Sequence, residues 1–377
     1  MVKNSALGII FPNQYDELVP ELTGVRLMAS IPFASRYRMI DFPLSSMVHS
    51  GITNISILAR SNYHSLMDHL GSGREWDLSR KNGGLTVWPP FAEKTMERYK
   101  GRVEALVHIT GFLAEQKEKY VILSDTNIAA SFDFKEFIQY HADSGAVVTV
   151  AYTRQELPES IMNARRMDKG MYYTYEVEDG VVKDIFINAQ DPGIQNFGMN
   201  IYCIERKTLI KMINESYMRG GVYFERDILQ HTIDAAKVAG FCFDKYYGRI
   251  SDMKSYFDEN MRLLQEENLD KLFSKPVYTK LRDDNPTRYM EGSIVKNVMA
   301  ADGCVIEGDV ENCVLFRGVR VGKGAVVKNC VLMQDTVVEE YANLDHIITD
   351  KDARITAETE VKGTESLPVY VAKYQVV

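Results

Sequence analysis

The stretch "GCVIEGDVENCVLFRGVRVGKGAVVKNCVLMQDTVV", residues 303–338, carries a six-residue repeat that decides the fold of the C-terminal part. Small or branched apolar residues recur at this spacing in two registers: Cys304, Val310 and Phe316, then Val319, Ala325, Val331 and Val337. A period of this length, with glycines at the turns, is typical of a parallel β-helix in which six residues form one flat side. We therefore expect the second set to face the interior throughout.

The N-terminal two-thirds of the chain alternates predicted strands and helices. Residues 52–60 and 120–125 are apolar, strand-like runs, and the helical pattern that begins at 134 stops at Gly145. This order predicts an α/β fold with a mostly parallel, doubly wound, Rossmann-like sheet covered by helices on both faces. Ligands of such sheets bind at the carboxyl ends of the strands, where Asp125 lies.

We expect two domains, as the length of 377 residues favours. The boundaries predicted are an α/β domain over 1–265, a linker over 266–290 and a β-helix over 291–377. The stretch 276–290 supports the linker because it has two prolines and many charges without periodicity. The C-terminal segment "LPVYVAKYQVV" alternates enough to form an added strand.

The composition of the chain argues against two classes of protein, those that bind nucleic acid in bulk and those that span a membrane. The chain is 45% hydrophobic and 25% charged, and its net charge of −8 argues against bulk affinity for nucleic acid. It has no apolar run of about 18 residues, so no membrane span is expected. Its five cysteines form no C-x-x-C motif, which is typical of free thiols in a reducing compartment. We expect a cytoplasmic protein that handles small molecules.

The N-terminal stretch "IIFPNQYDELVPELTGVR", residues 9–26, has a strand and a turn where α/β proteins often cradle phosphate. Phosphate loops use glycine so that the backbone can approach the ligand. Here the turn at 12–17 is bulky and net acidic. The chain therefore keeps the strand but lacks the phosphate loop.

Four segments in order resemble the ADP-glucose pyrophosphorylase (glucose-1-phosphate adenylyltransferase) family: "YRMIDFPLSSMVHSGI" (37–52), "WDLSRKNGGLTVWPPF" (76–91), "SYFDENMRLL" (255–264) and the hexapeptide tail. The resemblance extends over nearly the whole chain. It implies a nucleotidyltransferase domain followed by a left-handed β-helix. The family reaction joins ATP and glucose 1-phosphate into ADP-glucose and pyrophosphate, with Mg²⁺.

The resemblance also places the family's functional positions on this chain. Two are kept: Arg26, implied to face the triphosphate, and Asp125, the first metal-binding aspartate. The others are altered: Met28 at a triphosphate lysine, Arg102 and Glu104 in the segment "GRVEA" that stands for the family's Gly-Thr-Ala-Asp-Ala, Asn188 at the sugar-phosphate lysine, and Arg249 at the second metal-binding aspartate. Asp252 lies three residues beyond Arg249 and is expected to point elsewhere.

These losses bear on the chemistry because two anions must meet, which requires Mg²⁺, basic side chains and backbone amides. Asp125 is at most a remnant metal ligand, so no cofactor and no catalytic residue is expected. Arg249 either pairs with Asp125 in place of the metal, the alternative we favour, or binds an anion. Arg36 and Arg38 are equally consistent with solvated surface charges and with a functional role.

Three functions stay open. The first is a catalytically weak or silent regulatory subunit, which the resemblance implies pairs with a catalytic paralogue in a hetero-oligomer such as a tetramer. The second is an active nucleotidyltransferase with a divergent site. The third is a stand-alone sensor of a sugar phosphate or another small anionic metabolite, alone or as a homo-oligomer. The residues Met28, Asn188 and Arg249 favour the first over the second.

Overall fold

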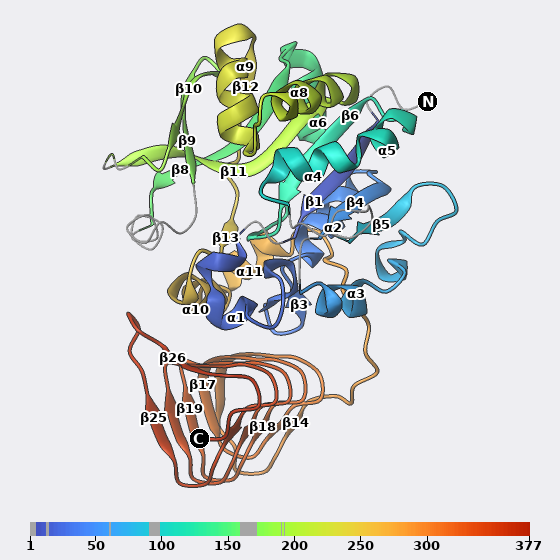
Figure 1. Cartoon of the computed structure of the whole chain (residues 1–377). Coiled ribbons are helices and arrows are strands. Elements are labelled where there is room, and N and C mark those ends of the chain that lie inside the picture. Colours follow the sequence, from blue (N-terminus) through green and yellow to red (C-terminus); the bar gives the residue numbers. More distant parts are fainter. Residues whose placement is uncertain are drawn as a thin grey trace.

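The computed structural model describes residues 5–12, 15–59, 62–89, 99–158, 172–189, 191 and 193–377. Figure 1 shows an α/β domain in the upper part and a β-helix below it. The α/β domain is built on a nine-stranded sheet. Its strands lie in the spatial order β5 (Gly84–Trp88), β4 (Asn54–Leu58), β1 (Ala6–Phe11), β6 (Tyr120–Asp125), β11 (Ile194–Glu205), β8 (Val148–Glu156), β12 (Val238–Cys242), β10 (Val181–Ile187) and β9 (Tyr173–Glu178).

The sheet has a parallel half and a mixed half. Strand β1 pairs in parallel with β4 and β6, and β4 pairs in parallel with β5. Strand β11 runs antiparallel to both β6 and β8, and β10 runs antiparallel to β12 and β9. The expected doubly wound arrangement therefore holds for the half that carries Asp125, while the distant half is mixed.

Helices cover both faces of the sheet because the strands are apolar on both sides. Leu7 and Ile9 of β1 pack with one set of helices, and Ala6 and Ile10 pack with the other. The helices are α1 (Pro20–Thr23), α2 (Asp41–His49), α3 (His64–Leu70), α4 (Arg102–His108), α5 (Thr110–Glu115), α6 (Phe134–Ser144), α8 (Arg206–Met218), α9 (Gln230–Ala235), α10 (Met253–Arg262) and α11 (Glu266–Leu272). In the described part, no helix has both the length and the apolar character that crossing a bilayer requires.

The C-terminal strands stack in parallel to form the β-helix. They are β14 (Arg288–Tyr289), β15 (Val295–Ala300), β16 (Val305–Ile306), β17 (Asp309–Leu315), β18 (Arg320–Val321), β19 (Val326–Lys328), β20 (Val331–Leu332), β21 (Val337–Val338), β22 (Asn343–Asp345), β23 (Ile347–Thr349), β24 (Arg354–Ile355), β25 (Glu360–Lys362) and β26 (Val369–Val371). The C-terminal segment adds the strand that its alternation predicts, since β26 pairs with β23.

The inward register differs from the strict six-residue spacing. Val321 pairs with Val338 and Val338 with Ile355, so each of these coils advances by 17 residues and one of its three sides is a residue short. The interior positions that continue the phase of Val319 and Ala325 are consequently Cys330 and Thr336.

The prediction that Val331 and Val337 face the interior of the β-helix is therefore wrong. Val337 is half-buried, whereas its neighbour Val338 is fully buried in the β-helix core. Val331 is buried, but it packs in the core between the two domains rather than inside the coil. A count in steps of six assumes that all three sides have equal length. Each side that is one residue short therefore shifts every later interior position by one.

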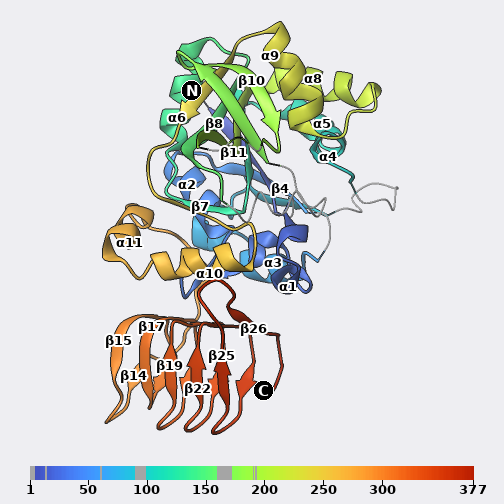
Figure 2. The same ribbon diagram turned by 90° about the vertical axis from the view of Figure 1, so that its left-hand side faces the viewer.

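Residues 266–290, expected to be a linker, contain helix α11 and end in the first β-helix strand, β14. Figure 2 shows α10 and α11 between the sheet and the β-helix. Tyr256 and Phe257 of α10 pack there with Phe316 and Met333 of the β-helix. The two domains consequently share a hydrophobic core.

Candidate functional site

The candidate site is at the carboxyl ends of β1 and β6. These strands are parallel neighbours whose last pair is Phe11 and Asp125. Because parallel strands place their carboxyl ends at one edge, this is where an α/β sheet binds ligands. Asp125 is only 5% exposed there.

An arginine of this chain binds the Asp125 carboxylate. Arg102, the first residue of α4, places Nη2 on Asp125 Oδ2 and Nη1 on Glu225 Oε1. Glu225 begins the π-helical turn Glu225–Leu229 and also accepts the Tyr202 hydroxyl at 2.9 Å. All three charged side chains are buried, so the site holds one cation between two carboxylates.

The prediction that Arg249 forms the ion pair with Asp125 is wrong, because Arg102 takes that place. Arg249 lies on β13 (Tyr247–Arg249), donates from Nη2 to the Gly198 carbonyl at 2.6 Å and stacks 3.8 Å from the centre of the Phe197 ring. Its charge still reaches Asp125, since it lowers the pKa of that carboxyl. The spacing of the residues along the sequence did not indicate which arginine would form the ion pair with Asp125.

Burial dominates the electrostatics of the Asp125 carboxyl. It raises the pKa of Asp125 to about 6, although Arg102 and Arg249 act in the opposite direction. For Arg102, burial favours loss of the proton, but Asp125 and the surrounding phenol oxygens outweigh it and leave the pKa raised. Arg102 consequently stays charged at neutral pH and Asp125 stays mostly ionised beside it.

Aromatic side chains fill the space around the pair. Tyr15, from the turn that replaces a phosphate loop, is buried, and its hydroxyl accepts from Asn200 Nδ2 at 2.6 Å. The Arg102 guanidinium lies 5.3 Å from the centre of the Phe11 ring and 5.9 Å from that of Tyr202. A bulky, buried tyrosine therefore stands where glycine would let a phosphate approach.

The other altered positions have structural contacts. Met28 is buried in the interdomain core, Glu104 accepts the backbone N–H of Lys100 at 2.7 Å, and Asn188 Oδ1 accepts the backbone N–H of Tyr172 at 3.0 Å. Within the described residues, no hydrogen bond or ion pair joins any of the three to Asp125. Each of the three side chains therefore has a contact within the fold that is separate from the Asp125 ion pair.

Asp252, which was expected only to point away from the metal position, caps helix α10. It accepts the backbone N–H of Ser255 at 2.6 Å, and the Ser255 hydroxyl reaches back to the Asp252 backbone. This reciprocal pair is a capping box at the start of α10.

Arg26 lies at the domain interface and not at the Asp125 site. Its Nη2 binds both oxygens of Asp350 in the β-helix, at 2.7 and 3.0 Å, and both side chains are buried. Tyr370 adds a hydroxyl bond to the same carboxylate at 3.1 Å. The arginine that the resemblance assigns to the triphosphate therefore joins the two domains here.

The residues present do not fit Mg²⁺. The ion prefers carboxylates and phosphate oxygens in octahedral geometry, but Asp125 is flanked by Arg102 and Arg249. Its Oδ1 has no hydrogen-bond partner among the described residues, but the Asp125 carboxyl interacts electrostatically with the guanidinium groups of Arg102 and Arg249 and with the Tyr15 phenol. No group of three or more metal-ligating side chains occurs in the part of the chain that the structure describes.

A second feature, missed by the sequence reasoning, is a cationic cavity between the domains, which we call the interdomain cavity. It has a volume of about 340 Å³, and its only acidic lining residue among those described is Asp68. Its basic lining residues are Arg36, Arg38, Lys280, Arg282, Arg317 and Lys351. Four of the six come from beyond residue 279, so no local spacing could have revealed that they converge.

The α/β sheet joined to a hexapeptide β-helix defines a nucleotidyltransferase-type protein. Comparisons with known families agree: residues 18–161 match the nucleotidyl transferase family and residues 280–366 match the GlmU-like C-terminal hexapeptide family. The glycogen biosynthesis protein GlgD of Bacillus subtilis is 31% identical over 99% of this chain and 97% of its own length.

Two further relatives come from other bacteria. GlgD of Geobacillus stearothermophilus is 33% identical over 86% of this chain and 84% of its own length. A glucose-1-phosphate adenylyltransferase of Clostridium perfringens is 28% identical over 90% of this chain and 87% of its own length. The chain belongs to the family that comprises GlgD and the glucose-1-phosphate adenylyltransferases.

Proposed function

We propose that this chain is a regulatory, catalytically weak or silent subunit of glucose-1-phosphate adenylyltransferase that acts in glycogen biosynthesis in the cytoplasm. The observation that carries the proposal is the buried contact of Arg102 with Asp125 and Glu225. Because of this contact, the aspartate at the one retained metal-binding position is already paired with a cationic side chain of the same protein. Catalysis by charge neutralisation at this point would require that cation to leave.

Burial makes the Arg102 guanidinium costly to displace. Displacing Arg102 would leave a guanidinium without its partners, and breaking a buried pair typically costs about 3–5 kcal/mol. An incoming Mg²⁺ would also meet Arg249, which is 7% exposed and fixed to the Gly198 carbonyl. Repulsion from a fixed buried cation opposes metal binding at the same place.

The proposed partner is a catalytic paralogue, in a hetero-oligomer such as a tetramer, with a homo-oligomer as the alternative. Support comes from the β-helix, where β25 ends one face of the stack with an open edge. Elsewhere on the β-helix and its C-terminal segment, four apolar side chains are more than half exposed: Tyr341, Leu367, Tyr374 and Val376. Open edges and exposed apolar side chains are features that partners cover.

The test is to purify the chain alone, an intact paralogue alone and the two together. Each sample is assayed for ADP-glucose synthesis and for mass in solution. The proposal expects background activity from the chain alone, a mixed assembly, and a changed rate or effector response of the paralogue. Normal turnover by the chain alone would establish the divergent-enzyme alternative instead.

A second, compatible function is the binding of a small anionic metabolite in the interdomain cavity. Six basic residues surround about 340 Å³ with one acid among the described lining residues. Such a cluster focuses positive potential on a concave surface. Titration of the chain with sulfate, followed by calorimetry with wild-type and Arg317→Ala proteins, tests this function. Equal affinities would contradict it.

A further inference from the structure

The bend that leads into strand β5 contains a chemically reactive pair, Asn82 and Gly83. It is the single Asn-Gly dipeptide in the sequence. Both residues are exposed, and they lie in a bend over residues 81–83. Strand β5 is an edge strand of the nine-stranded sheet and pairs on one side with β4. The pair is therefore accessible to water in the folded chain.

The usual structural role of an Asn-Gly pair does not apply at this bend. The pair is favoured in two-residue hairpin turns of type I′, in which both residues have a positive φ. Gly83 has a φ of +73°, but Asn82 does not have a positive φ. The strand that follows pairs with β4 in parallel, so the bend is not a hairpin turn. Turn geometry consequently does not explain why asparagine precedes glycine here.

The two groups that could react with each other are both free. Among the described residues, no hydrogen bond holds the Asn82 side-chain amide or the Gly83 backbone N–H. The backbone is anchored only from the next residue onward, where the Gly84 N–H donates to the Thr53 carbonyl at 2.7 Å. Because Gly83 has no Cβ, the Asn82 side chain can bring its amide carbon against the Gly83 nitrogen without a clash.

We propose that Asn82 is a site of spontaneous deamidation in the folded protein, with water as the co-reactant. The Gly83 nitrogen attacks the side-chain amide carbon of Asn82, Cγ. The new N–Cγ bond closes a succinimide ring, and the amide nitrogen leaves as ammonia with the proton of the Gly83 N–H. Water then opens the ring. Cleavage of the new N–Cγ bond yields aspartate, and cleavage of the original peptide bond yields isoaspartate, whose backbone runs through Cβ.

The fold should tolerate both products. Each adds a negative charge beside Lys81, and isoaspartate also lengthens the backbone by one carbon. Gly84 is bound to Thr53 and packed against the Leu78 carbonyl, so the bend has to absorb the extra length. The inference does not depend on a regulatory role or on a partner chain, because the reaction requires only this bend and water.

The experiment is incubation of the full chain at mildly alkaline pH, followed by peptide mapping with mass spectrometry. Aspartate should appear at position 82, and a protein isoaspartate methyltransferase should esterify the isoaspartate fraction. The rate should rise with pH, because the Gly83 nitrogen attacks after losing its proton. Asn285 is the internal control. It is also exposed, but Pro286 follows it and has no N–H, so it should stay unchanged.

Two variants test the pair itself. Asn82→Gln changes an exposed side chain and should abolish the product, because the longer side chain would have to close a larger ring. Gly83→Ala should slow the reaction about tenfold or more, since a Cβ hinders the attack and about 1.4 kcal/mol of added barrier is a factor of ten.

Three results would overturn the proposal. The first is an unchanged Asn82 in the folded chain over a period in which the chain unfolded in guanidinium chloride reacts, which would mean that the bend protects it. The second is equal conversion of Asn285. The third is a wild-type rate in Gly83→Ala.

Discussion

The guanidinium of Arg26 binds the carboxylate of Asp350, 324 positions later in the chain, at 2.7 and 3.0 Å. Both side chains are almost completely buried, at 3% and 1% exposure. A residue that the family resemblance assigns to a nucleotide therefore stabilises the contact between the α/β domain and the β-helix. This relationship yields the first prediction.

Arg26→Ala should lower the free energy of unfolding by about 3–5 kcal/mol, because it leaves Asp350 buried without its ionic partner. Urea denaturation measures the change. Lys271→Ala is the matched control, since Lys271 pairs with Glu267 on the surface and its loss should cost at most about 1 kcal/mol. Equal costs for the two substitutions would show that the Arg26 pair has no special role.

Restoring a single family residue should not restore catalysis. We expect both Arg249→Asp and Arg102→Thr to leave ADP-glucose synthesis at background. In the Arg249→Asp variant, Arg102 still pairs with Asp125. In the Arg102→Thr variant, Arg249 and Tyr15 remain beside it. The contributions of groups that act on one transition state are strongly non-additive, so one substitution is not enough. A turnover of roughly 1–10³ s⁻¹ from either variant would contradict this prediction. An intact paralogue provides the positive control in the same assay.

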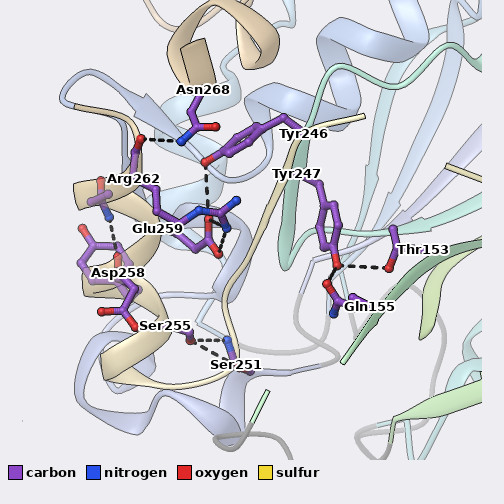
Figure 3. A network of polar contacts seen from close by, with 12 residues as sticks. Thr153, Gln155, Tyr246, Tyr247, Ser251, Ser255, Asp258, Glu259, Arg262 and Asn268 are labelled. Atoms are coloured by element: carbon purple, nitrogen blue, oxygen red, sulfur yellow. Dashed lines mark hydrogen bonds and ion pairs between the residues drawn. The ribbon is translucent and has the colours of Figure 1, made fainter. Parts of the chain in front are cut away.

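The carboxyl of Glu259, which contacts Arg262 and the Tyr246 hydroxyl (Figure 3), should make stability depend on pH. Burial raises its pKa to about 7, with Arg262 opposing, so the folded state binds its proton more tightly than the unfolded state. The stability that this proton contributes is complete below the unfolded pKa of 4.5 and is lost as the pH rises through about 7. Relative to Glu259→Gln, the wild type should therefore lose up to roughly 3 kcal/mol over this range.

Urea denaturation of both proteins at several pH values tests the Glu259 prediction. The Asp125 carboxyl also titrates in this window, but it is present in both proteins and cancels in the difference. A difference in the free energy of unfolding that stays constant with pH would show that Glu259 titrates normally.

Anion binding in the interdomain cavity should weaken as the pH rises from 6 to 8. Burial lowers the pKa of Lys351 to about 7, with Arg38, Arg26 and Lys373 acting in the same direction and Asp350 opposing. Lys351 therefore loses its positive charge over this range, whereas sulfate keeps its double charge. Calorimetry with sulfate should show the falling affinity.

Lys351→Gln should flatten the dependence of sulfate affinity on pH. Lys323→Gln, which changes an exposed lysine of the β-helix outside the described lining of this cavity, should retain the dependence. If both variants keep the wild-type slope, another group controls the anion affinity.

Because each coil advances by 17 residues, the adjacent residues Val337 and Val338 should contribute differently to stability. Val338 is 1% exposed in the β-helix core, so Val338→Ala should cost roughly 1–3 kcal/mol through lost burial and a cavity. Val337 is half-buried, so Val337→Ala should cost less than about 1 kcal/mol. Thermal or urea denaturation distinguishes the two. The reverse order would restore the strict six-residue register.

The sequence by itself determined the fold class, because periodicity and strand–helix order are local properties. The hexapeptide repeat predicted the β-helix, and Asp125 at the end of an apolar run marked the edge of the sheet where ligands bind. The absence of a glycine-rich turn, together with Met28 and Asn188, already argued against ordinary nucleotide chemistry.

Only the tertiary structure decided how the charges pair. Arg102 rather than Arg249 binds Asp125, and Arg26 binds Asp350 of the other domain. A charge interacts with whatever the fold brings within a few ångströms, and that distance bears no relation to spacing along the chain. For the same reason the interdomain cavity was invisible in the sequence, since it combines residues from segments that meet only when the chain is folded.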